Sequence, residues 1–137
     1  MTIISIEEGI FSRLSTYTSL ATLISTRVYP LKLPQTVTLP AITYQRISTP
    51  RELTHDQQAG GLAMPRFQFT CWGTTFSSVK GVVKELRNCL NGFSGTFGSG
   101  ASTVSVGGVL SANEIDSFDP ESGLYWTAVD YFIHHQE

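Results

Sequence analysis

The chain has 137 residues, which favours a single domain that can bury a core without disulfide or metal staples. Only 15% of the residues are charged, the net charge is −2, and Lys and Arg form no cluster, which argues against tight binding of nucleic acid phosphates. No apolar run approaches the roughly 20 residues that a membrane-spanning helix needs, and MTIISIEEGI lacks the basic start of a signal peptide. So few charges are consistent either with buried contacts between subunits or with a Ser/Thr-rich monomer surface.

An amphipathic helix is expected from Ser5 to about Ser25. Ser5 and Glu8 form an S-x-x-E capping box at its start. Apolar residues then recur at spacings of three and four, as one buried stripe requires: Ile6, Ile10, Leu14, Tyr17, Ala21 and Ile24. Gly9 should weaken this helix slightly because glycine is a poor helix former.

The stretch RVYPLKLPQTVTLPAITYQRIS, residues 27–48, predicts two strands, Arg27–Tyr29 and Ala41–Ile47. Pro30, Pro34 and Pro40 pin their connection and remove backbone donors, so this segment can pair along only part of its length. Residues 48–65 have no sustained period and predict a long loop or loose hairpin.

Arg66–Trp72 is the clearest strand, because Phe67, Phe69 and Cys71 alternate with polar residues and Trp72. A second helix spans Phe76–Leu90, and the segment after it is Gly/Ser-rich without a period. Thr103–Ala112 predicts a strand with a bulge at Gly107–Gly108.

An acidic turn is expected at Asn113–Gly123, followed by a final strand, Leu124–His135. The odd positions of that strand include Tyr125, Val129, Tyr131 and Ile133, and its even positions include Leu124, Trp126 and Phe132. Because both faces are apolar, helices on one side would leave the other face in need of a second cover.

The predicted order is α-β-β-β-α-β-β in one domain, residues 1–137. An α+β fold, with a mostly antiparallel sheet and two helices on one face, is the economical packing.

Residue patterns for catalysis or metal binding are weak. His134 and His135 are adjacent, so in a strand they point to opposite faces, and we expect both at the surface. His55–Asp56 lacks an accompanying nucleophile motif, and Asp116, Asp119 and Glu121 lack a complete calcium-loop pattern, so turn formation is their expected role. We expect Cys71 and Cys89 to be buried free thiols.

Arginines surround the long loop: Arg46, Arg51 and Arg66 either pair locally or contact another protein. Trp72 and Trp126 belong either to the core or to an interface. The residues alone therefore indicate no enzyme, cofactor or metal, and favour assembly.

Four stretches in this order resemble the tail completion, or tail terminator, family of long-tailed bacteriophages with non-contractile tails. They are RVYPLKLPQTVTLPAITYQRIS at 27–48, THD within the loop at 54–56, RFQFTCWGTTFSSVKGVVKELRNCLNGFSG at 66–95 and SGLYWTAVDYFIHHQE at 122–137. No single motif is specific, and the resemblance rests on their order and spacing across nearly the whole chain.

The resemblance implies a non-enzymatic virion protein, similar in fold to the lambda-type tail terminator and assembled in the host cytoplasm. Such subunits form a ring, typically a hexamer, that caps the tail tube and joins the head connector, while DNA passes through the lumen without being read. Guided by it, we take Arg51, His55, Asp56, Arg66, Trp126 and Phe132 as candidate interface residues.

Two other functional classes remain open at this stage. One is a different neck ring, such as a head-closure or adaptor protein. The other is a small-ligand-binding or enzymatic α+β domain, which a pocket with convergent polar groups and a monomeric state would favour.

Overall fold

The computed structural model describes residues 2–3, 5–49, 51–53, 59–100 and 102–136. Its helices are α1 (Ile6–Thr16), α2 (Thr18–Ile24) and α3 (Phe76–Leu90). Its strands are β1 (Thr2–Ile3), β2 (Val28–Pro30), β3 (Ala41–Ser48), β4 (Arg51–Leu53), β5 (Ala59–Ala63), β6 (Arg66–Gly73), β7 (Gly95–Ser99), β8 (Ser102–Asp119) and β9 (Leu124–Gln136). The α+β class is therefore confirmed.

The strands form one curled sheet in the order β1-β8-β9-β6-β3-β2, with β7 beside β8, β5 beside β9 and β4 beside β5. Because β2 pairs with β3 and β1 with β8 in parallel, the sheet is mixed, and the prediction of a mostly antiparallel sheet is wrong. The long, Pro-rich connection between β2 and β3 explains the first case. It carries the chain back to the start of β2, which a tight hairpin cannot do.

The first predicted helix is two helices, so the described residues contain three rather than two. Tyr17 adopts an extended conformation with φ −75° and ψ 109°, and it ends α1 and precedes α2. The run Thr16-Tyr17-Thr18 favours a break because these side chains are poor helix formers. After the break Leu20 and Ile24 are buried, whereas Ala21, expected in the stripe, is only half-buried.

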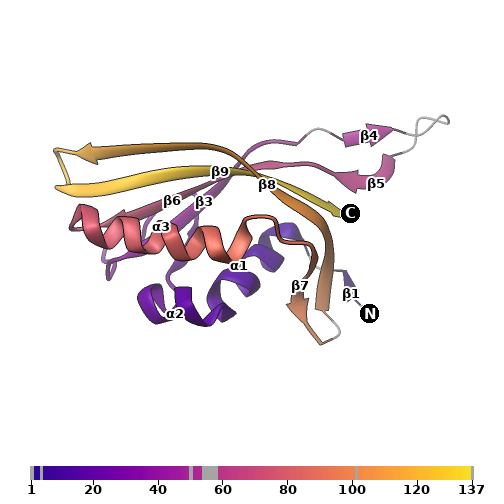
Figure 1. Ribbon diagram of the computed structural model, residues 1–137, viewed down its shortest axis with the longest axis horizontal. Helices are drawn as coiled ribbons and strands as arrows, with labels where there is room; N and C mark the ends of the chain where they lie inside the picture. The colour runs from indigo at the N-terminus through magenta and orange to yellow at the C-terminus, as the bar shows by residue number, and fades with distance from the viewer. Residues whose placement is uncertain (1, 4, 50, 54–58, 101, 137) are drawn as a thin grey trace.

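All three helices lie on one side of the sheet, and the opposite side carries none of them (Figure 1). The core lies between the two layers and includes Ile10 and Leu14 of α1, Leu86 of α3, and Phe67 and Tyr131 of the sheet. The expected alternation of β6 is confirmed, since Phe67, Phe69 and Cys71 are buried.

Strand β8 is much longer than predicted and absorbs most of the expected acidic turn. It bends past α1 at its beginning and then follows β9 along the sheet (Figure 1). Its register with β9 shifts between Val106 and Gly108, which confirms the predicted bulge, and again between Ser111 and Asn113. The chain turns only after Asp119.

Strands also form in two segments that show no regular apolar period in the sequence, the one after α3 and the one between residues 48 and 65. Gly95–Ser99 is β7 and pairs antiparallel with β8. Residues 51–53 and 59–63 form the loose hairpin expected between residues 48 and 65, and β5 attaches to β9 through Leu62 and Ala63.

Helix α1 approaches β7 and β8 closely at Gly9. A Cβ atom at this position would lie 2.6 Å from Val104 Cγ1 and 3.0 Å from Phe97 Cβ. Gly9 therefore permits a close approach between helix and sheet, a role that its low helix propensity does not reveal.

Candidate assembly interface

The side of the sheet away from the helices, here called the outer face, is built from alternate residues of four strands. The register places these side chains in rows across it: Thr43 and Gln45 of β3; Arg66, Gln68, Thr70 and Trp72 of β6; Leu110, Asn113, Ile115 and Ser117 of β8; and Trp126, Ala128, Asp130 and Phe132 of β9. The residues between them on β6 and β9, such as Phe69 and Val129, are buried under the helices. No described helix covers the outer face.

An aromatic pair occupies one row of the outer face. The Trp72 and Trp126 rings have centroids 6.1 Å apart, and the Trp72 Nε1–H donates to Thr43 Oγ1 at 3.0 Å. Both indole side chains are half-buried. Trp126 thus rests on Trp72 and keeps part of its surface available for another molecule.

Arg66 and Asp130 form an ion pair in the same face. Arg66 Nε and Nη2 donate to Asp130 Oδ2 at 3.1 and 2.7 Å, and the guanidinium lies 5.6 Å from the centre of the Phe132 ring. The Asp130 side chain is 8% exposed and that of Arg66 is 32% exposed. Because the two charges neutralise each other, the outer-face rows from Arg66 to Trp72 carry no uncompensated charge. Charge depletion of this kind is typical of the core of a protein interface.

Towards β8 the outer face becomes apolar and open. Leu110 is 55% exposed and Ile115 is 49% exposed. Sequence reasoning missed both residues as interface candidates because each follows a bulge that breaks the alternation, and because the acidic residues around Ile115 suggested a turn.

The acidic residues of β8 instead face α3. Glu114 accepts from Arg87 at 2.8 Å, and Asp116 accepts from Lys80 at 2.6 Å and from Thr127 at 2.7 Å. The hydrogen bond from Lys80, followed by that from Thr127, lowers the pKa of Asp116 below its usual value. Asp116 is therefore part of an ion-pair network, while Asp119 accepts from the Glu121 amide in the turn, as expected of a turn residue.

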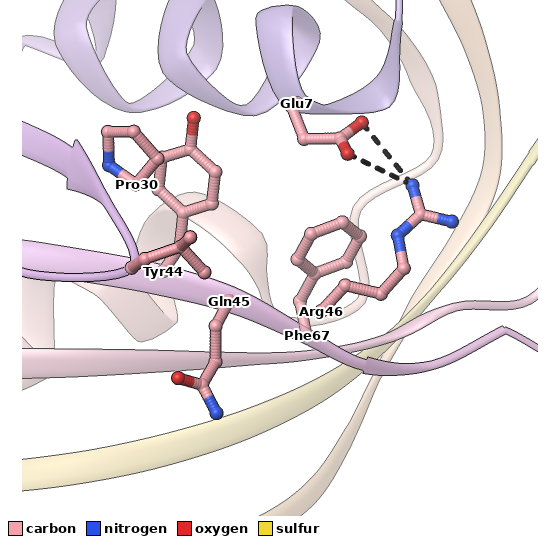
Figure 2. A pocket seen from close by; sticks show the side chains of 7 residues that line it. Glu7, Pro30, Tyr44, Gln45, Arg46 and Phe67 are labelled. Carbon is pink, nitrogen blue, oxygen red and sulfur yellow. Dashed lines mark hydrogen bonds and ion pairs between the residues drawn. The ribbon is translucent and has the colours of Figure 1, made fainter.

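A shallow cavity of about 260 Å³ lies between α1 and the β2–β3 end of the sheet. Figure 2 shows Glu7 and Arg46 facing each other across it, while Gln45 points to the other side of β3. Arg46 Nη2 donates to both Glu7 carboxylate oxygens, at 3.3 and 3.2 Å. Burial, and then the Glu7 charge, raises the pKa of Tyr44. The charged groups of the cavity pair with each other, so they do not converge on a ligand.

Three of the six predicted interface residues, Arg66, Trp126 and Phe132, lie together on the outer face. Asp130, which pairs with Arg66, was not predicted. The sequence did contain a signal for Asp130, because it is a lone carboxylate among the apolar residues of the last strand. Arg51 belongs to β4, but its side chain, and all of His55 and Asp56, lie outside the described residues.

The remaining titratable candidates do not form a reactive site. His134 and His135 do lie on opposite faces of β9, but His135 is 4% exposed, so the expectation that both are at the surface is wrong. Odd positions of β9 face the core, which explains its burial. Cys71 and Cys89 are buried and free, as predicted, and burial raises the pKa of both thiols, to about 11 for Cys89. Among the described residues no cluster of His, Cys, Asp and Glu could hold a metal ion.

One family of known proteins matches the chain over most of its length. The sequence model of the family described as "Tail completion protein gp17" matches residues 8–135. The chain belongs to this family. The family name agrees with the resemblance found in the sequence, and it supports a structural role in a phage tail for this tail completion protein.

Solved structures agree on the fold. A structure described as "Virion of native gene transfer agent (GTA) particle" contains a chain similar to this tail completion protein, with a TM-score of 0.71 and 12% identity, over 97% of this chain and 96% of that one. No curated protein matches the chain. None of the helices in the described ranges is long and apolar enough to span a bilayer.

Proposed function

We propose that this protein closes the end of a phage tail tube as a ring of identical subunits, and that the finished ring offers the surface to which the head connector binds. Membership of the tail completion family over residues 8–135 is the observation that carries the proposal. The fold shared with a chain of a gene transfer agent virion supports it. In this proposal the ring is a hexamer assembled in the host cytoplasm, and DNA passes through it without specific contacts.

The outer face supplies the subunit contact in this proposal. It combines half-buried tryptophans, exposed Leu110 and Ile115, and a neutralised Arg66–Asp130 pair, a composition that suits burial against protein. A ring contact is heterologous, so the neighbouring copy meets this face with a different part of its own surface. The protein needs no catalytic residue, cofactor or metal for such a role.

The main alternative is a neck ring on the head side, such as a head-closure or adaptor protein. Electron microscopy of purified protein mixed separately with tail tubes and with filled heads distinguishes the two roles. We expect density at the end of the tail tube and none at bare head portals. Binding to heads alone would replace the proposal by the alternative, and a monomer that binds neither would refute both.

Trp126→Ala tests the outer face itself. If Trp126 is a central contact, the substitution should weaken subunit association by roughly 2 kcal/mol or more. Light scattering across a concentration series measures association, tail-tube binding is measured in parallel, and circular dichroism on the same samples monitors folding.

Phe11→Ala is the matched control, because Phe11 is 41% exposed and lies on α1 in the helix layer rather than on the outer face. It should leave association unchanged. If Trp126→Ala unfolds the chain, Trp126 is a core residue. If it changes neither association nor tube binding, the interface lies elsewhere.

A further inference from the structure

One margin of the sheet is an open strand edge. Val106 of β8 pairs with both β7 and β9, so these two strands lie on opposite sides of β8. On the β7 side the pairing ends at Val106, and the Gly92 amide donates to the Val109 carbonyl at 3.1 Å. Beyond Val109 no described strand pairs with that side of β8. Residues Leu110–Asp119 therefore present backbone donors and acceptors to solvent.

This open edge also carries large apolar side chains that are exposed. Leu110, Ile115 and Phe118 are 55%, 49% and 46% exposed, and all three belong to it. An open edge readily accepts another strand, and soluble proteins usually protect it with prolines, lysines, bulges or a covering loop. This edge contains no proline or lysine, and one bulge, between Ser111 and Asn113, interrupts it. Strand addition to such an edge is a common way of binding a peptide segment.

The other margin of the sheet, at β2, is closed. Pro30 has no N–H group, and the Val28 and Lys32 amides already donate to the Thr26 and Pro30 carbonyls, both at 2.8 Å. A second sheet therefore cannot continue this one through β2.

The connection after β2 nevertheless contains a strand-forming sequence that pairs with nothing. Residues 35–39, QTVTL, lie between Pro34 and Pro40, and half-buried Val37 and Leu39 alternate with exposed Thr36 and Thr38. Within the described part of the chain, none of the five amides of this segment donates a hydrogen bond. The segment has the composition and the unused donors of a strand, but no sheet of its own.

We propose that residues 35–39 of one copy add as a strand to the open edge, Leu110–Asp119, of the next copy. The proposal rests on the ring described under Proposed function and adds a strand pairing at the β8 margin of the outer-face contact. The sheet order places β8 and β2 towards opposite margins, so each copy offers one surface on each side, as a heterologous ring contact requires.

The charges at the two surfaces are complementary. Arg27 and Lys32, beside the donor segment, pair with no acid among the described residues, and Arg27 donates only to the Pro40 and Leu23 carbonyls. Asp119 and Glu121, at the far end of the open edge, pair with no base in the same part of the chain. Opposite charges at the rim of a contact favour the correct partner and speed the encounter.

Disulfide trapping tests the contact directly. Thr36→Cys is combined in turn with Ser111→Cys, Asn113→Cys and Ser117→Cys, because the register across copies is not fixed in advance and a disulfide needs Cα atoms about 4.4–6.8 Å apart. The native thiols at Cys71 and Cys89 are buried and can stay. Each single-cysteine variant is the control for its pair.

Oxidation of the assembled double variants should give a ladder of cross-linked copies that ends at the ring size, and single variants should give none. The proposal is overturned if rings form or tails are capped while no double variant cross-links, and in that case the proposed function survives. It is equally overturned if Ser117→Cys alone cross-links as efficiently, since two β8 edges would then meet. A protein that neither associates nor binds tails refutes both proposals.

A charge exchange supplies a second, independent readout. Lys32→Glu and Glu121→Lys should each weaken association about tenfold at low salt, and the double variant should recover most of the loss. Equal, additive losses in the double variant would show that the two surfaces do not meet.

Discussion

Alanine at Gly9 should destabilise the protein, although helix propensity alone predicts the opposite. Inside a helix, alanine is more favourable than glycine by about 0.8–1.0 kcal/mol. At Gly9, however, the new Cβ would lie 2.6 Å from Val104 Cγ1 and 3.0 Å from Phe97 Cβ, closer than ordinary van der Waals contact. Forcing an extra methyl group into a packed core costs typically ~1–3 kcal/mol. The net expectation is a loss of about 1 kcal/mol, with an upper limit near 2.

Gly81→Ala is the matched control, since Gly81 lies inside α3 and a Cβ there has no atom within 4 Å. This substitution should stabilise the protein by about 0.8–1.0 kcal/mol. Urea denaturation followed by circular dichroism gives both free energies of unfolding. Val104→Ala removes the nearer atom, so the cost of Gly9→Ala should be smaller in that background.

If Gly9→Ala stabilises the chain as much as Gly81→Ala does, the close approach at Gly9 costs no stability and the prediction is wrong. The prediction is also wrong if the effects of Gly9→Ala and Val104→Ala simply add, because the contact between the two side chains would then have no energetic consequence.

Three further predictions concern the charged residues and the thiols. Arg66→Ala should cost roughly 1–3 kcal/mol of stability, because it leaves the largely buried Asp130 carboxylate without its partner, and adding Asp130→Asn should recover much of this loss in urea titrations. The pKa of Asp116 is lowered in the folded protein, so its carboxylate stabilises the fold at pH values above the usual pKa of 3.8. This stabilisation is lost as the pH falls through the folded-state pKa. Asp116→Asn should therefore destabilise the protein at pH 7 and have no effect on its stability in strong acid. Cys71 and Cys89 should react with a thiol reagent at pH 8 only after denaturation, and rapid labelling of native Cys71 would show that its face of β6 is not core.

Much of the fold could be predicted because local patterns agree with tertiary packing. The alternation of Arg66–Trp72 and the 3.6-residue period of Phe76–Leu90 both place apolar groups on one side, and both elements occur where expected. The two-sided apolar pattern of the last strand likewise indicated a face that the helices leave uncovered.

The errors arose where backbone geometry overrides a period. The extended conformation at Tyr17 divides a stripe that reads as continuous in sequence. Strand β7 has almost no apolar alternation, since only Phe97 is buried and its glycines have positive φ at Gly95 and Gly98. β1 pairs in parallel with β8, and β2 pairs in parallel with β3. No local sequence pattern encodes these pairings, because they join segments that are separated along the chain.

The candidate interface could be predicted only in part for the same reason. Trp126, Phe132 and Arg66 lie on regular strands, where alternation gives the face of each side chain. Leu110 and Ile115 follow bulges, so their faces cannot be counted from the start of the strand. The partnership of Arg66 with Asp130 joins residues that are 64 positions apart and emerges only from the register of β6 with β9.

The paired bulges of β8 restrict how its length can change in related sequences. Even-numbered residues such as Val106 face the helices before the first bulge, odd-numbered Val109 faces them between the bulges, and even-numbered Glu114 and Asp116 do so after the second. Deleting Ala112 would remove the second bulge but keep Ser111 opposite Tyr131 and Asn113 opposite Asp130, so both carboxylates would still face α3. Deleting a residue between Glu114 and Phe118, where the pairing is regular, would instead turn the later side chains of the strand to the opposite face. Single deletions in this strand should therefore be tolerated at the bulges and not between them.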